Sequence, residues 1–184
     1  CREGFSLELI GSYNVSLITK KGIVFTPLHD MTVNLLFKAI KKDNGSFMEI
    51  PSVVNVEGTY NNEGKNAKPF VIPSLREWHG AEGNFTLTTK SRIVIDAKYE
   101  GTLMQAAKIF QDDLDKLCAI KPKILIGKPK GGDIFISLDG KNDELGTEGY
   151  SLSIHDYVSI NAAQYKGAFW GTRTLLQILE QDHT

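Results

Sequence analysis

Four adjacent residues, Arg76, Glu77, Trp78 and His79, have the side-chain types that proteins use to contact carbohydrate. An indole ring can lie against the face of a sugar ring, while Arg and Glu side chains can hydrogen-bond to hydroxyl groups. The same residues can instead fix a joint between two domains, with Trp78 buried and Arg76 paired with Glu77. We favour the joint, because large aromatic side chains are mostly highly buried and nearby prolines restrict the backbone.

No other pattern in the sequence indicates a reactive centre. The histidines lie too far apart in the chain to form a metal-ligand motif: His29, His79, His155 and His183. The loop Gly127–Asp133 lacks the Gly-Lys-Ser/Thr ending of a phosphate loop, and no Gly-x-Ser-x-Gly motif occurs. We therefore expect no metal, no other cofactor and no serine-hydrolase chemistry.

The composition is that of an ordinary globular protein. The 184 residues suffice for one or two domains, and 41% of them are hydrophobic and 23% charged. The formal net charge of -1 gives no electrostatic reason to expect binding to nucleic acid or to acidic lipid. Because no run of ~18 apolar residues occurs, we expect no membrane span.

The two cysteines, Cys1 and Cys118, carry little information. Cys118 lies at the apolar end of a predicted helix and is expected to be a buried free thiol. Pairing with Cys1 is the alternative, but terminal residues are usually mobile. A leading Cys also fits a processed bacterial lipoprotein, or a residue introduced by cloning.

Residues 1–66 have the pattern of a β-rich domain. Strands are predicted at Phe5–Ile10, Tyr13–Thr19, Gly22–Thr26, Thr32–Ile40 and Ser52–Val56. A helix competes over part of Thr32–Ile40, but its near-alternating apolar residues favour a strand. Asn44-Gly45 predicts a tight turn, and the short strands together predict a β-sandwich-like domain. The polar segment Asn61–Pro69 predicts a linker.

Residues 67–184 mix strands with two helices. Strands are predicted at Phe85–Thr88, Arg92–Asp96, Pro122–Ile126 and Ile134–Leu138, with a hairpin over Tyr150–Ile154 and Tyr157–Ala162. Helical spacing of apolar residues predicts helices over Thr102–Ala119 and about Tyr165–Gln181. The second helix is expected to bury Phe169, Thr172, Leu175, Leu176 and Leu179. The whole chain is therefore predicted to be α+β, with a mainly antiparallel sheet and two helices on one face in this second domain.

Two stretches of this second domain resemble a known family. Pro73–Gly80, with Gly83–Thr88 and Ser91–Asp96 after it, resembles the opening of the small domain that precedes the catalytic barrel in bacterial family 20 β-N-acetylhexosaminidases. Gly149–Leu179 resembles the end of that domain. The resemblance covers about residues 68–181 and implies the non-catalytic N-terminal region of an extracytoplasmic glycoside hydrolase that is secreted, periplasmic or lipid-anchored. Its own C-terminal catalytic barrel, of ~250 residues, is expected after Thr184.

The resemblance also implies where the catalytic groups are expected. Family 20 enzymes use the substrate's acetamido group as nucleophile, and their acid Glu adjoins an Asp in a His-x-Gly-Gly-Asp-Glu-like barrel motif. The only adjacent Asp-Glu pair here, Asp143-Glu144, lacks the preceding His-x-Gly-Gly and lies in a charged loop. We expect this pair at the surface and assign no catalytic residue to the chain. The parent protein is thus expected to be an enzyme, and this segment alone is not.

Two alternatives remain open. The chain can be a stand-alone carbohydrate-binding or adhesion module, for which an N-acetylated glycan is the expected ligand. It can also be the equivalent domain of a family 84 O-GlcNAcase or a hyaluronidase-like enzyme, since related barrels carry a similar domain. The residues that follow Thr184 would discriminate between a module and an enzyme.

Overall fold

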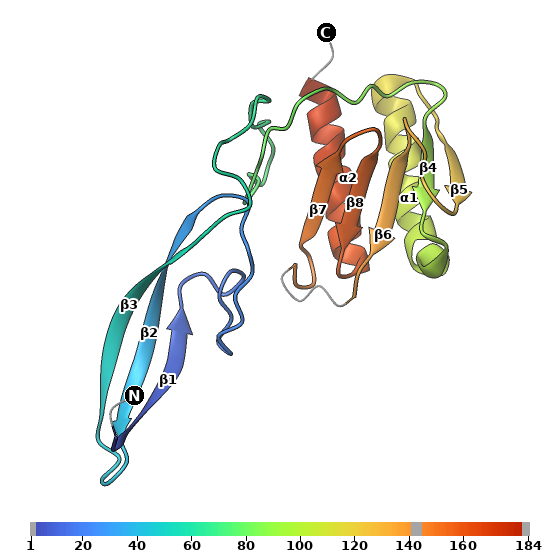
Figure 1. The fold of residues 1–184 in the computed structure, drawn as a ribbon. Coiled ribbons are helices and arrows are strands. Elements are labelled where there is room, and N and C mark those ends of the chain that lie inside the picture. Colours follow the sequence, from blue (N-terminus) through green and yellow to red (C-terminus); the bar gives the residue numbers. More distant parts are fainter. Residues whose placement is uncertain (1–2, 141–144, 182–184) are drawn as a thin grey trace. The chain divides into compact units, whose positions relative to one another are not determined.

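The computed structural model describes residues 3–140 and 145–181, and the chain divides into two compact units. The first unit contains Cys1–Lys68 and Arg76–Ala81, and the second contains Pro69–Leu75 and Glu82–Thr184. The chain therefore passes between the units three times. Each unit has its own sheet, and the second unit also has two α-helices (Figure 1), which confirms the predicted α+β class. Cys1, the Asp143-Glu144 pair and His183 lie outside the described residues.

The first unit contains a three-stranded antiparallel sheet. Its strands are β1 (Phe5–Ser12), β2 (Met31–Lys41) and β3 (Phe47–Val56), in the order β1-β2-β3. Gly45 has a φ of 70°, and the Ser46 amide donates to Asn44 Oδ1 (3.0 Å), so this Asn-Gly turn connects β2 to β3 as predicted. The strand assignment of Thr32–Ile40 is likewise confirmed.

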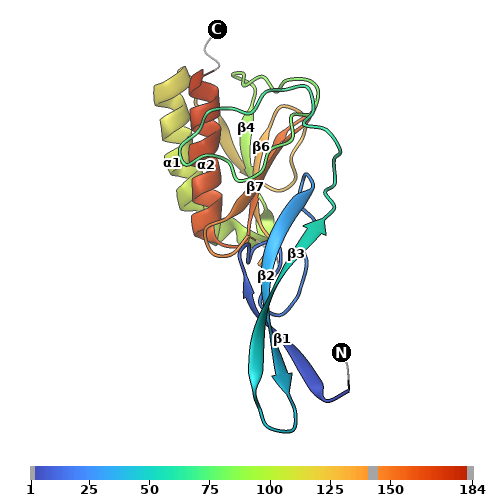
Figure 2. The ribbon, with the colours of Figure 1, turned by 90° about the vertical axis from the view of Figure 1, so that its left-hand side faces the viewer.

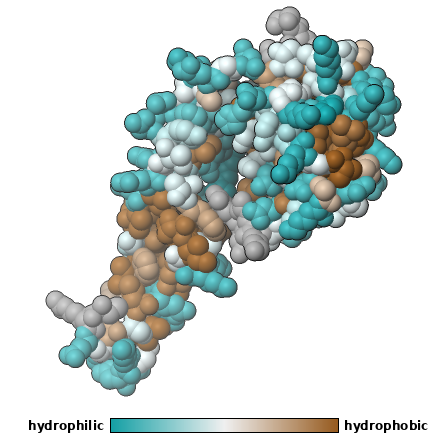
Figure 3. Space-filling model, turned by 45° about the vertical axis from the view of Figure 1, so that its right-hand side comes forward, coloured by the Kyte–Doolittle hydropathy of each residue, from teal (hydrophilic) through white to brown (hydrophobic). Residues whose placement is uncertain are grey.

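A single sheet replaces the predicted β-sandwich in the described part of the first unit. The predicted strands Tyr13–Thr19 and Gly22–Thr26 form a loop instead, in which Ile18 and Val24 make one isolated bridge. Leu17 and Ile18 of this loop pack on Val33 and Leu35 of β2. The loop therefore buries the apolar residues of β2 that a second sheet was expected to cover. Elsewhere the unit leaves apolar side chains exposed, and they gather over its sheet in the face shown in Figure 3.

The second unit contains a five-stranded mixed sheet in the order β5-β4-β6-β8-β7. Its strands are β4 (Arg92–Ile95), β5 (Lys123–Ile126), β6 (Ile134–Leu138), β7 (Tyr150–Ile154) and β8 (Val158–Ala162). The prediction of a mainly antiparallel sheet is wrong, because β4 pairs in parallel with β5 and β6, and β6 with β8. Of the strand pairs described in this five-stranded sheet, only the predicted hairpin of β7 and β8 is antiparallel. A helical crossover joins β4 to β5, and this kind of connection makes neighbouring strands parallel.

Two long helices, α1 (Glu100–Cys118) and α2 (Tyr165–Gln181), cover one face of this sheet (Figure 2). A short 3-10 helix, η1 (Ala97–Tyr99), precedes α1. The core between the layers joins Phe110 and Leu114 of α1, Leu175 of α2 and apolar strand residues such as Ile95 and Ile136. Phe85–Thr88 is not a strand, although Phe85 and Leu87 pack against this core. Among the described residues, neither helix combines the length and apolar character that crossing a bilayer requires.

Small residues set how closely α2 approaches the sheet. Gly167, Ala168 and Gly171 are buried on the sheet-facing side of α2. A Cβ on Gly171 would overlap the Ile160 side chain of β8, so only glycine fits there. Thr172 and Leu175 are buried as predicted, whereas Phe169, Leu176 and Leu179 are only half-buried. The buried stripe is therefore narrower than the apolar spacing of the sequence indicated.

Candidate functional site

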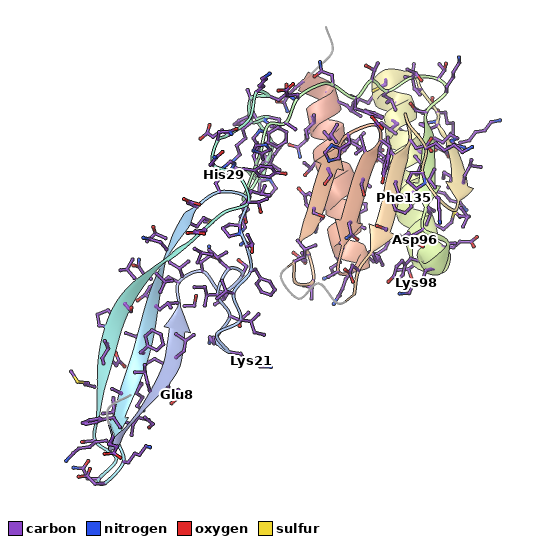
Figure 4. The ribbon with its side chains drawn as sticks, in the orientation of Figure 1. Glu8, Lys21, His29, Asp96, Lys98 and Phe135 are labelled. Carbon is purple, nitrogen blue, oxygen red and sulfur yellow. The ribbon has the colours of Figure 1, made fainter. Side chains whose placement is uncertain are left out.

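Arg76, Glu77, Trp78 and His79 were predicted either to contact carbohydrate or to fix a joint between two domains. They lie in a segment that belongs to the first unit. We call this segment, Arg76–Ala81, the strap. It lies against residues 27–30 and 59–66, which we call the receiving loops. These loops are themselves paired, because the amides of Thr59 and Tyr60 donate to the carbonyl oxygens of Pro27 (2.9 Å) and Leu28 (2.8 Å). Figure 4 shows His29 within this cluster of loops above β2 and β3.

Backbone hydrogen bonds hold the end of the strap. The Gly80 amide donates to the Glu63 carbonyl oxygen (2.7 Å), and the Gly80 carbonyl oxygen accepts from the amides of Lys65 and Asn66. Asn66 Nδ2 also donates to the Ala81 carbonyl oxygen (2.6 Å). Gly64 and Gly80 form a parallel bridge in which a Cβ on either residue would overlap the backbone opposite. The strap therefore needs glycine on both sides of this contact.

Each side chain from Glu77 to His79 also contacts a receiving loop. Glu77 Oε2 accepts from the Leu28 amide (2.6 Å), and Trp78 Nε1 donates to the Asn66 carbonyl oxygen (3.2 Å). His79 Nδ1 donates to the Asn62 carbonyl oxygen (3.2 Å). Arg76 pairs with its neighbour Glu77 at 3.6 Å. All four predicted residues thus lie together, and three of them bind the receiving loops directly.

Aromatic rings add to these polar contacts. The rings of Tyr60 and His79 stack, and His29 lies beside both, 6.3 Å from Tyr60 and 5.6 Å from His79 between ring centroids. His29 Nε2 also donates to the Trp78 carbonyl oxygen (2.9 Å). Trp78 itself is half-buried and lines a hollow of ≈ 320 Å³ with His29 and residues 63–68. The hollow has room for a small polar ligand, and one face of the indole can contribute to its wall.

Sequence reasoning missed three of the residues that hold the strap, namely His29, Tyr60 and Asn66. They lie in loops and follow no periodic pattern, and His29 and Tyr60 are separated from the strap by many residues. The signal that was available is the pair of glycines, Gly64 and Gly80, each inside a polar segment. Isolated glycines of this kind often mark a close approach between two stretches of backbone.

The second unit has a buried carboxylate that was not predicted either. The Asp133 side chain is 2% exposed and accepts from Arg92 Nε (2.8 Å), from Arg92 Nη2 and from the Lys130 amide (2.7 Å). Burial acts to raise the pKa of the Asp133 carboxyl, but the hydrogen bonds from Arg92 and the Lys130 amide outweigh it, so the pKa is lowered. A carboxylate whose hydrogen-bonding capacity is used in this way fastens the start of β4 to the loop before β6.

The remaining titratable groups form no reactive cluster in the described ranges. Asp113 pairs with Arg173, so it connects α1 to α2, while Asp112 and Asp115 pair with Lys121. Cys118 is a free, half-buried thiol, and burial raises its pKa. No group of three or more His, Cys, Asp or Glu residues within residues 3–140 and 145–181 could hold a metal ion.

Comparison with protein families gives a match over most of the chain. The family model described as glycosyl hydrolase family 20, domain 2, matches residues 68–184. The matched range contains the five strands and both α-helices of the second unit, and it also contains the strap. No curated protein matches the chain.

Proposed function

Because this chain belongs to the family described as glycosyl hydrolase family 20, domain 2, we propose that it is a non-catalytic part of a β-N-acetylhexosaminidase-like glycoside hydrolase. In this proposal the second unit supports the catalytic barrel of the same protein, and the protein acts outside the cytoplasm. The family match over residues 68–184 carries the proposal. The surface of the helix pair that faces away from the sheet supports it.

A groove of ≈ 320 Å³ runs over the outer side of the helix pair. Leu117 and Leu176 give it apolar walls, and Asp113, Lys116, Gln177 and Glu180 line the rest. On the same two helices, the side chains of Trp170 and Ile109 are 46% and 37% exposed. Exposed tryptophan and aliphatic side chains beside a groove are typical of the centre of a protein interface.

A second set of apolar side chains adjoins this groove. Gln177 pairs with the backbone of Ile72, donating to its carbonyl oxygen (3.0 Å) and accepting from its amide (2.9 Å). Gln181, one turn later, pairs with the backbone of Phe70 in the same way. The intervening Val71 is buried, whereas the side chains of Phe70 and Ile72 are 77% and 71% exposed. Two apolar side chains are thus held outward on an ordered backbone, which lowers the entropy cost of binding a partner.

The proposal is tested by joining the chain to a family 20 catalytic barrel and measuring the thermal stability of the barrel. We expect Phe70→Ala and Trp170→Ala to lower the barrel's melting temperature, and Tyr13→Ala, in the first unit, to leave it unchanged. Residues 1–184 alone are expected not to hydrolyse an aryl N-acetyl-β-glucosaminide. Turnover by the purified chain that survives Asp143→Asn and Glu144→Gln would contradict the proposal.

A second candidate is binding of an N-acetylated glycan in the first unit. The observation that favours it is the half-exposed Trp78 beside the hollow lined by His29 and residues 63–68. Its test is Trp78 fluorescence in a Trp170→Phe background, titrated with chitooligosaccharides. A saturable response in this background would favour a binding module, and a flat titration would leave the strap with a purely structural role.

A further inference from the structure

The strap contacts the receiving loops as a short peptide ligand contacts its binding site. Five of its six residues have a hydrogen bond or ring contact with the receiving loops, from Glu77 through Ala81. The contacts combine backbone pairing at Gly80, a hydrogen bond from the Trp78 indole N–H and a stacked ring at His79. Pairing of extended backbones gives affinity and pockets for particular side chains give specificity in peptide recognition.

The connections of the strap set it apart from an ordinary loop of the first unit. Pro69–Leu75 precedes it and Glu82 follows it, and both belong to the second unit. The strap is therefore a ligand-like element that its own chain delivers from the other unit. An element with such connections can be exchanged between two copies of a chain, because every contact in the exchanged state repeats one made within a single chain.

We propose that the receiving loops recognise the strap of a second copy of this chain, so that two copies can exchange straps. The ligand is an extended segment of the type Glu-Trp-His-Gly. The Glu77 carboxylate accepts a hydrogen bond from the Leu28 amide, and the Trp78 indole N–H donates one to the Asn66 carbonyl oxygen. The His79 imidazole stacks on the Tyr60 ring. The glycine is required because a Cβ at position 80 would overlap the Asn66 backbone.

Two variants of residues 1–184 separate the two halves of this recognition. Gly80→Val disables the strap and leaves the receiving loops intact. Gly64→Val disables the receiving loops and leaves the strap intact, because a side chain there overlaps the Gly80 backbone and Gly64 has a φ of 80°. Neither variant can pair with itself, but the first can accept the strap of the second. A milder strap variant, Glu77→Ala with His79→Ala, replaces Gly80→Val if that substitution prevents folding.

The experiment is sedimentation of each variant alone and of the equimolar mixture. Each alone should run at the mass of one chain, 20.4 kDa, and the mixture should contain a species of twice that mass. Excess peptide of residues 75–83 should return the mixture to single chains, whereas the same peptide with valine at position 80 should not. Gly101→Val, at an α1 position where a Cβ meets no atom within 4 Å, is the matched control and should not associate with Gly80→Val beyond the wild-type level.

Two results would overturn the proposal. One is a mixture that stays at the mass of one chain while circular dichroism shows that both variants keep their helices. The other is a dimer formed by Gly80→Val alone, because its strap cannot enter the receiving loops and such a dimer must use another surface.

Discussion

Tyr60 and His79 stack face to face, with ring centroids 3.6 Å apart and ring planes 5° from parallel. Tyr60 comes from a receiving loop and His79 from the strap, so the stack joins two segments of the first unit between which the chain passes through the second unit. Aromatic contacts of this kind stabilise the folded state by ~1 kcal/mol, in addition to the stabilisation from the apolar area that they bury. The stack is therefore one of the contacts that keep the strap in place.

Tyr60→Ala is expected to lower the free energy of unfolding of the first unit by at least ~1 kcal/mol, because it removes the stack and part of the buried area. The measurement is urea unfolding followed by Trp78 fluorescence in a Trp170→Phe background. Tyr13→Ala, at a side chain that is 79% exposed, is the control and should stay within ~0.5 kcal/mol of the parent. Equal effects of the two substitutions would show that the stack contributes nothing.

Asp133→Asn is expected to destabilise the second unit by roughly 3 kcal/mol at neutral pH. The value is at the low end for breaking a buried ion pair, because Arg92 still reaches solvent. Since the pKa of Asp133 is lowered in the folded state, its stabilisation is present above the ordinary Asp pKa and is lost as the pH falls through the folded pKa. The difference between wild type and Asp133→Asn, measured by thermal unfolding, should shrink from about pH 4 downward. A difference that is constant from pH 7 to pH 2 would contradict this assignment.

Leu175→Ala is expected to cost ~2–5 kcal/mol, because Leu175 is 1% exposed in the core between α2 and the sheet. Leu176→Ala should cost clearly less, since Leu176 is half-buried and lines the outer groove. Chemical denaturation followed by the helical circular dichroism signal measures both. The reverse order of the two losses would mean that α2 is rotated by about one residue about its axis.

Gln177→Ala should speed hydrogen exchange at the Ile72 amide, and Gln181→Ala should do so at the Phe70 amide. Each amide donates to the Oε1 of the respective glutamine, and a hydrogen bond of this kind contributes ~0.5–1.5 kcal/mol, or roughly 2-fold to 13-fold in protection. Glu180→Ala, on the same helix but without a bond to this segment, is the control. Unchanged exchange at both amides would show that the pairing is not maintained in solution.

Much of the second unit could be predicted from the sequence. The bounds of α2 and β6 agree with the predicted ones, because helical spacing of apolar residues and short apolar strands are local signals. The direction of pairing is not local. Whether β4 runs parallel to β6 depends on the order of strands in the sheet, and periodicity within a strand does not contain that order.

The strap shows a similar division between local and distant signals. Its unusual composition singled out Arg76–His79, but the contacts of Glu77 with Leu28 and of Trp78 with His29 join residues that are 49 positions apart. In the first unit, Tyr13–Thr19 had the composition of a strand, yet it forms a loop whose Leu17 and Ile18 lie on β2. Leu17 and Ile18 of this stretch are buried, whereas Tyr13 and Val15 are exposed, so the composition fixed neither the burial of the whole stretch nor its backbone conformation.

Because the chain passes between the units three times, gene recombination cannot easily separate the two units. The family match begins at residue 68, yet the strap, inside the matched range, completes the first unit. A gene rearrangement that joins a new N-terminal region at residue 68 would leave Glu77, Trp78 and His79 without the loops that bind them. Conversely, a first unit transferred without the downstream gene segment would lose its strap. Recombination therefore has no single junction at which both units remain intact, and the two are expected to be inherited together.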